Sequence, residues 1–207
     1  MKVLLLNGSP HQHGCTATAL EEVGGALAQC GVETQKLWIG NRPVRGCIAC
    51  GGCRKTGVCV FDDDPANEII RAIQGADGLV VGAPVHYASA GGAAVSLLDR
   101  VFYAAGRSFA GKPAAAVASA RRAGTTATLD ELNKYFMISA MPVVSSTYWN
   151  MVHGNTPDEV RQDLEGLQIM RNLGRNMAWL LRCIEAGRAA GDSFPQQDRS
   201  QYTNFIR

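Results

Sequence analysis

Four cysteines lie close together in the chain, and their spacing suits inorganic redox chemistry. Successive members are separated by two, two and five residues, and they are Cys47, Cys50, Cys53 and Cys59. Bacterial ferredoxins bind [4Fe–4S] clusters with a similarly dense spacing, whereas a zinc site usually separates its two ligand pairs by a longer stretch. We therefore expect a [4Fe–4S] cluster on these cysteines, with a zinc ion or reduced free thiols as the alternatives.

A second pattern lies near the N-terminus, where Lys2 and the apolar residues 3–6 run into a polar loop and then a helix. Such a loop offers hydroxyls and free backbone N–H groups to an anion. The P-loop spacing fails because Cys15 stands where the lysine should be, and the dinucleotide fingerprint fails because a serine and a proline follow Gly8. A phosphomonoester fits better, which favours FMN over ATP or NAD. The alternative is an ordinary turn with Thr16 as the helix cap.

The elements that must position these residues follow from hydrophobic patterning. Strands are expected at residues 2–6, 32–39, 78–82, 112–118 and 142–149, and helices at 16–30, 65–75, 92–105, 125–139 and 157–186. Strands that alternate with helices predict an α/β fold with an open five-stranded parallel sheet covered by helices on both faces. Ligands of such sheets bind beyond the carboxyl ends of the strands, where we expect loops 9–16, 84–89 and 119–124.

Length, charge and cysteine content limit the classes of protein to which the chain can belong. The 207 residues are expected to form one domain over residues 1–190, with a cysteine-rich loop at 40–64 and a C-terminal arm at 191–207. A net charge of +2 gives no electrostatic case for nucleic acid or membrane as a partner. No signal peptide is visible, so a cytoplasmic location is expected. In a cytoplasmic chain, seven cysteines favour thiol, metal or cluster chemistry over disulfides.

The motifs together resemble the NAD(P)H-dependent FMN reductase branch of the flavodoxin-like fold. The chain carries Asn-Gly-Ser-Pro at 7–10 with Gly-Cys-Thr at 14–16, Ala-Pro-Val-His-Tyr at 83–87, and Leu-Leu-Asp-Arg at 97–100. Two residues depart from the family pattern: Cys15 replaces the usual asparagine, and His86 stands where many members have tyrosine. The first weakens one side-chain hydrogen bond to a phosphate, and the second leaves the ring-contacting residue unassigned.

The resemblance implies that three loops hold FMN and that the flavin itself, with no catalytic side chain, does the chemistry. The first loop would bind the phosphate, the second would follow the edge of the ring, and the third would place one arginine near the flavin N1, where reduced flavin is negative. The residues so implied are Ser9, His11, Gly14, Cys15, Thr16, Pro84, Val85, His86, Tyr87, Ser119, Arg121, Arg122 and Gly124.

The cysteine spacing is also similar to that of the iron–sulfur flavoproteins, a subgroup of this family in which the cluster passes single electrons to FMN. The resemblance first implies an oxidoreductase that uses NAD(P)H to reduce a small acceptor, such as a quinone, a nitro or azo compound, or a flavin. The alternative is one-electron transfer between a ferredoxin-type partner, the cluster and FMN. A non-catalytic flavodoxin-type carrier would need an acidic surface, which the charge of +2 disfavours. A homodimer or homotetramer is expected from the family.

Overall fold

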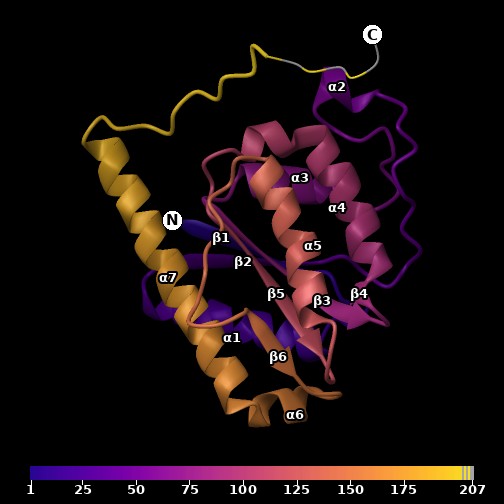
Figure 1. Ribbon diagram of the computed structural model, residues 1–207, viewed down its shortest axis with the longest axis vertical. Coiled ribbons are helices and arrows are strands. Elements are labelled where there is room, and N and C mark those ends of the chain that lie inside the picture. The colour runs from indigo at the N-terminus through magenta and orange to yellow at the C-terminus, as the bar shows by residue number, and fades with distance from the viewer. Residues whose placement is uncertain (202, 204, 206–207) are drawn as a thin grey trace.

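The computed structural model describes residues 1–201, 203 and 205, and a parallel sheet forms its centre (Figure 1). The strands lie in the order β2 (Glu33–Trp38), β1 (Lys2–Asn7), β3 (Gly78–His86), β5 (Ala114–Ala120) and β6 (Met151–His153). A short strand, β4 (Ser89–Ala90), pairs antiparallel with the end of β3. The expected α/β fold, an open five-stranded parallel sheet, is confirmed.

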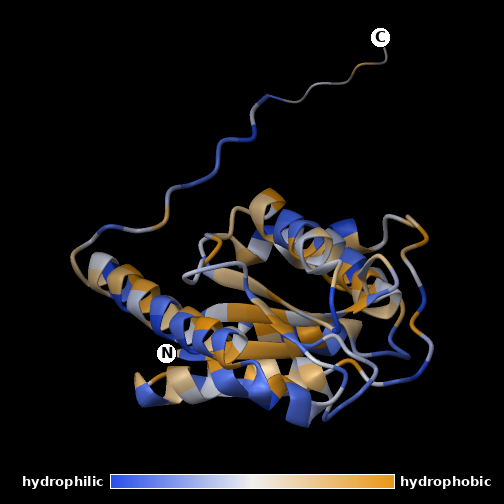
Figure 2. Cartoon of the chain, turned by 60° about the horizontal axis from the view of Figure 1, so that its bottom comes forward, coloured by the Kyte–Doolittle hydropathy of each residue, from blue (hydrophilic) through white to orange (hydrophobic). Residues whose placement is uncertain are grey.

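Helices cover both faces of this sheet. In Figure 2 the apolar strands, in orange, lie between the helices. One layer contains α1 (Cys15–Gln29), α6 (Pro157–Gln162) and α7 (Leu164–Ala189). The other contains α3 (Ala66–Gln74), α4 (Gly92–Ala105), the 3-10 turn η1 (Gly106–Phe109) and α5 (Thr125–Ile138). Successive residues of a strand point to opposite faces, so Val3 and Leu5 pack on the first layer while Leu4 and Leu6 pack on the second.

The predicted fifth strand at residues 142–149 is wrong. Only Val143 forms a bridge, to Ala114, and the chain then leaves the sheet until β6 begins at Met151. Polar side chains explain the departure, because hydroxyls and amides can bond the backbone in place of a neighbouring strand. The hydroxyl of Ser146 donates to the carbonyl of Tyr148 at 2.8 Å, and Asn176 of α7 donates to the carbonyl of Ser145 at 2.8 Å.

The predicted helix at 157–186 is divided into α6 and α7 at Asp163. One carboxylate oxygen of Asp163 accepts from the N–H of Gly166 at 2.9 Å and caps α7, while the other accepts from the N–H of His153 at 2.8 Å. A capping residue has a non-helical backbone, and Asp163 has φ −77° and ψ 77°. The side chain of Asp163 therefore links the start of α7 to the end of β6.

The remaining differences concern the ends of elements. Helix α1 begins at Cys15 with Gly14 as its cap, so Thr16 is not the cap. The predicted strand at 78–82 extends to His86, and a short helix, α2 (Cys53–Thr56), forms inside the cysteine-rich segment. In the predicted arm, the described residues form no helix or strand, and Tyr202, Asn204, Ile206 and Arg207 lie outside the described residues. None of the described helices is long and apolar enough to span a bilayer.

Two glycines of α7 give a test of the packing between α1 and α7 within one helical layer. A Cβ at Gly174 would lie 2.7 Å from the Cβ of Ala26 and 2.7 Å from the carbonyl oxygen of Val23, both on α1. We expect Gly174→Ala to lower the free energy of unfolding by about 1–3 kcal/mol through overpacking, measured by urea titration.

Gly187, in the same helix, is the matched control. The nearest atom to its added Cβ is 3.7 Å away, so Gly187→Ala should raise stability by about 0.5–1 kcal/mol, because alanine loses less backbone entropy than glycine. Equal effects of the two substitutions would contradict the close contact between α1 and α7.

Candidate functional site

The side chain of Asn7 shapes the N-terminal loop, residues 8–15, whose last residue is the first of α1. Asn7 ends β1 and is 6% exposed. Its Oδ1 accepts from the N–H of Ser9 at 3.0 Å, and its Nδ2 donates to the carbonyls of His11 and Gln12, each at 3.2 Å. One buried amide therefore bonds to three points of the loop and fixes its curvature.

This loop leads into the first turn of α1, where backbone donors remain available. Among the described residues, no side chain caps α1 and no acidic residue stands in its first turn, so N–H groups at the start of the helix can meet an anion. The hydroxyl of Ser9 accepts from the N–H of His11 at 3.1 Å and keeps its own proton to donate. A Cβ at Gly14 would lie 2.9 Å from the Cβ of His11, so the loop has room only for glycine there.

The structure brings Thr16 and Ser119 together. Their hydroxyl oxygens are 2.7 Å apart, and both residues are buried between α1 and the end of β5. The hydroxyl of Thr16 thus joins two of the predicted loops at their bases. Either hydroxyl can be the donor in this pair, so one of the two protons stays available to an anion. His11, by contrast, is exposed at the outer side of the loop.

The second predicted loop forms a tight hairpin between β3 and β4. Its tip is Tyr87, which is fully exposed and has φ +65°. The N–H of Ala88 donates to the carbonyl of His86 at 2.8 Å. From α5, Glu131 accepts hydrogen bonds from the hydroxyl of Ser89 and from the backbone of Ala90. The hairpin is therefore held from behind, and its tip faces outward.

The third predicted loop packs against this hairpin. A Cβ at Gly124 would lie 2.6 Å from the Cγ1 of Val85, and Gly124 has φ +88°, a conformation that favours glycine. Pro84 is in register with Ser119 on the neighbouring strand. Arg121 and Arg122 are both exposed on the loop. The three loops thus meet at the carboxyl edge of the sheet, with buried hydroxyls beneath them and two arginines above.

Cys15 stands at the start of α1, beside the loop that follows β6. Its thiol donates to the carbonyl of Gly154 at 3.5 Å, and burial is the largest cause that raises the pKa of Cys15. A raised thiol pKa keeps the sulfur protonated and weakly nucleophilic. Cys15 therefore acts as a neutral group in the N-terminal loop.

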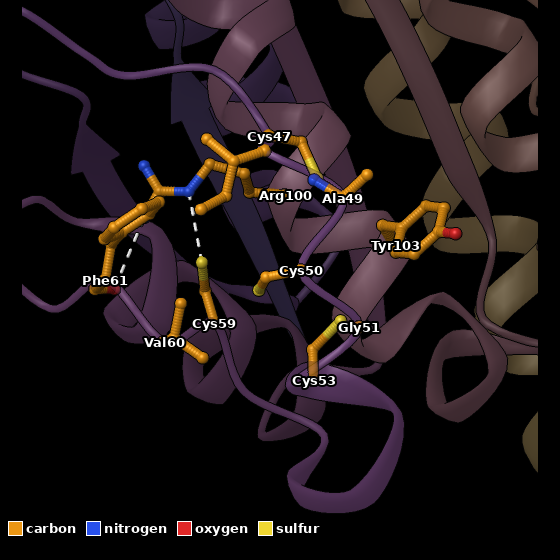
Figure 3. A pocket seen from close by; sticks show the side chains of 11 residues that line it. Cys47, Ala49, Cys50, Gly51, Cys53, Cys59, Val60, Phe61, Arg100 and Tyr103 are labelled. Atoms are coloured by element: carbon orange, nitrogen blue, oxygen red, sulfur yellow. Dashed lines mark hydrogen bonds between the residues drawn. The ribbon is translucent and has the colours of Figure 1, made fainter.

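The four clustered cysteines line one pocket in the cysteine loop, residues 40–64, which runs along the outside of α4 (Figure 1). Figure 3 shows their side chains around this pocket, with Tyr103 at one side. Burial is the largest cause that raises the pKa of Cys53, and the charges of the other three cysteines raise it further. All seven cysteines lie in the described part of the chain, and none forms a disulfide.

The base of the cysteine loop is fixed by Arg100 of α4, which is 2% exposed. Its guanidinium forms an ion pair with Asp64 and donates to the sulfur of Cys59 at 3.2 Å. Burial alone would lower the pKa of Arg100, but the hydrogen bonds to Asp64 and Cys59 outweigh it and raise the pKa above its ordinary value. Asp64 also accepts from the N–H of Ala66 at 3.1 Å, beside Pro65, the N-cap residue of α3.

The family of the chain follows from a family model that matches most of its length. Residues 1–156 match the family model described as NADPH-dependent FMN reductase. The chain belongs to the NADPH-dependent FMN reductase family. The family resemblance drawn from the three loop motifs is thereby confirmed.

Named relatives agree with the subgroup that the cysteine spacing indicated. An iron–sulfur flavoprotein of Methanocaldococcus jannaschii is 29% identical over 195 residues, which cover 89% of this chain and 100% of the relative. An iron–sulfur flavoprotein of Methanosarcina thermophila is 29% identical over 197 residues, which cover 91% and 99%. A solved archaeal flavodoxin, 14% identical, matches 88% of this chain and 99% of its own with a TM-score of 0.60. The flavodoxin-like fold is confirmed.

Three positioning residues were missed in the sequence. In the sequence, Asn7 stands out only as part of a motif and not as the group that shapes the loop. The signal for its role is its place at the end of a buried strand, just before Gly-Ser-Pro. Arg100 carried a signal, because with Asp99 it forms the only charged pair in the otherwise apolar and small sequence of α4. Glu131 carried none, because its partners lie more than 40 residues away.

The role of Asn7 can be tested by one isosteric change. Asn7→Asp keeps the acceptor for Ser9 but replaces two donors with a carboxylate that faces the carbonyls of His11 and Gln12. We expect the free energy of unfolding of the FMN-free chain to fall by about 1–3 kcal/mol, measured in urea.

Gln12→Glu is the control, because it makes the same amide-to-carboxylate change on an exposed side chain of the same loop. Its effect should stay within about 0.5 kcal/mol. If both variants are equally stable, the Asn7 amide does not hold the loop.

Proposed function

We propose that this chain is an iron–sulfur flavoprotein that binds FMN at the carboxyl edge of its sheet, holds a [4Fe–4S] cluster on the cysteine loop, and passes single electrons between them. The observation that carries the proposal is that the thiols of Cys47, Cys50, Cys53 and Cys59 line one pocket. The names of its relatives support the same function.

The residues at the carboxyl edge fit FMN. The N-terminal loop offers the Ser9 hydroxyl and the first N–H groups of α1 to a phosphate, and glycine at position 14 leaves the space that a side chain would fill. The outward hairpin at 84–89 and the exposed Arg121 or Arg122 are suited to the ring. Bound FMN supplies the exchange between two-electron and one-electron chemistry, while the protein orients it and stabilises negative charge near N1.

The cysteine pocket fits a cluster better than a zinc ion. The four cysteines are separated by two, two and five residues, a dense spacing like that of bacterial ferredoxins. A zinc site usually separates its two ligand pairs by a longer stretch. The four side chains line one pocket, which is the arrangement that a cluster with one thiolate at each iron needs.

A second candidate function is the reduction of a small acceptor by NAD(P)H. The family description favours it, since it names an NADPH-dependent enzyme. In this case FMN would take electrons from the nicotinamide directly, and the cysteine loop would not be needed for that step. The two functions therefore differ in whether reduction of the flavin depends on the cluster.

We also infer a homodimer or homotetramer. Exposed apolar side chains surround the cysteine pocket, namely Ile48, Val60 and Tyr103, and Tyr87 is exposed at the other site. Contiguous exposed apolar side chains mark contact surfaces. Phe102, which precedes Tyr103 on α4, is 8% exposed and packs in the core, so it is not part of this surface. A monomeric mass at micromolar concentration in analytical ultracentrifugation would contradict the inference.

The cluster is tested by anaerobic reconstitution with iron and sulfide. Because each thiolate binds one corner of the cluster, we expect each of Cys47→Ser, Cys50→Ser, Cys53→Ser and Cys59→Ser to lose most of the bound iron. Cys15→Ser should keep it, because Cys15 lies in the N-terminal loop. If the wild-type chain takes up no more iron and sulfide than Cys50→Ser, the cysteine loop does not carry a cluster.

The electron donor separates the two functions. We expect reduced bacterial ferredoxin to bleach the flavin absorbance of the reconstituted wild-type chain under anaerobic conditions, and to bleach that of Cys50→Ser far more slowly. NADPH and NADH are added in parallel samples. Reduction by NADPH at the same rate in both proteins, with no response to ferredoxin, would favour the second candidate and reject single-electron transfer through the loop.

A further inference from the structure

Arg100 is a cation buried at the contact between α4 and the cysteine loop. Its side chain is 1% exposed, and the partner carboxylate, Asp64, is 8% exposed. Further hydrogen bonds run from its Nη atoms to the carbonyls of Arg45 and Phe61, at 3.2 and 3.3 Å. These contacts with oxygen atoms join three separate points of the loop to one helix.

One donor of Arg100 is not used in this way. Its Nε–H points to the sulfur of Cys59 at 3.2 Å, as the dashed line in Figure 3 shows. A thiol sulfur is a weak acceptor, whereas a charged acceptor forms hydrogen bonds about twice as strong as a neutral one. The contact therefore gains most when Cys59 is a thiolate, which is the form that binds metal.

The ion pair with Asp64 does not require this contact. Nη1 binds the carboxylate and the carbonyl of Arg45, and Nη2 binds the carbonyl of Phe61. The contact of the Nε–H with sulfur could therefore be lost while these three interactions remain. The fold of the loop base and the contact with sulfur are thus separable functions of one side chain.

We propose that Arg100 is a positioning residue for the cluster, which holds the Cys59 corner by an N–H···S hydrogen bond and raises the reduction potential of the cluster. This inference rests on the proposed function. Reduction adds one electron to the cluster, and a hydrogen-bond donor and positive charge beside a ligating sulfur stabilise the more negative state. Hydrogen bonds to the sulfurs and net charge are among the factors that set such potentials.

The test is a redox titration of reconstituted protein followed by electron paramagnetic resonance, after iron and sulfide have been measured. We expect Arg100→Gln to shift the equilibrium at least tenfold toward the oxidised cluster, which is about 59 mV for a one-electron couple. Arg100→Lys keeps the charge but lacks the planar guanidinium, so it should recover only part of the shift.

Arg45→Gln is the matched control. The Arg45 guanidinium lies 4.6 Å from the centre of the Phe61 ring and that of Arg100 lies 5.4 Å from it, but Arg45 is half exposed and pairs with Asp63. Because solvent and Asp63 screen this exposed charge, its loss should shift the potential much less than the loss of Arg100. An unchanged potential in iron-loaded Arg100→Gln, or an equal shift in Arg45→Gln, would overturn the inference.

A measurement on the wild-type chain covers the case in which Arg100 variants do not fold or load. Protein labelled with ¹⁵N-arginine is reconstituted and reduced, and nuclear coupling to the cluster is recorded by electron–nuclear double resonance. Coupling to an arginine nitrogen is expected, and its absence overturns the inference. A wild-type chain that binds no iron would instead defeat the proposed function, and this inference with it.

Discussion

Strand β1 is buried on both faces and hydrogen-bonded on both edges, to β2 and to β3, and the arrangement of the molecule depends on this. A strand so enclosed is apolar through its middle, here Val3 to Leu6. It runs parallel to its neighbours, since helices connect them. Parallel direction brings the carboxyl ends of β1, β3 and β5, at Asn7, His86 and Ala120, to one edge. The meeting of the three loops of the candidate site is a consequence of strand direction.

The cysteine loop has little regular structure of its own, with one short helix, α2. Ordering such a loop is opposed by conformational entropy, and it buries few large apolar side chains in return. The buried pair of Arg100 and Asp64 supplies the missing contacts at its base. Desolvation makes a buried ion pair a weak source of net stability, yet loss of one partner is strongly destabilising. The ion pair of Arg100 and Asp64 therefore fixes the position of the loop and adds little to the net stability of the fold.

The two candidate sites lie at different points along α4. The helix begins at Gly92, just after the hairpin, and Arg100 follows eight residues later, about 12 Å along the axis at 1.5 Å per residue. One rigid element thus separates the hairpin of the candidate flavin site from the cysteine pocket within a chain. The apolar side chains around that pocket, Ile48, Val60 and Tyr103, lie on the outside of the molecule, where a second chain or an electron-transfer partner can reach them.

The sequence by itself determined the order of strands and helices, the loop motifs and the cysteine spacing, because these depend on residues close together in the chain. It failed where a distant partner decided the outcome. The fifth strand moved to β6 because Asn176 of α7 binds the carbonyl of Ser145, and the Thr16 hydroxyl faces Ser119, 103 residues away. The charge of Arg100 was legible in the sequence, but only the packing of α4 against the loop places it on Asp64 and Cys59. Hydrogen bonds and ion pairs act over a few ångströms in space, and the distance along the chain does not limit them.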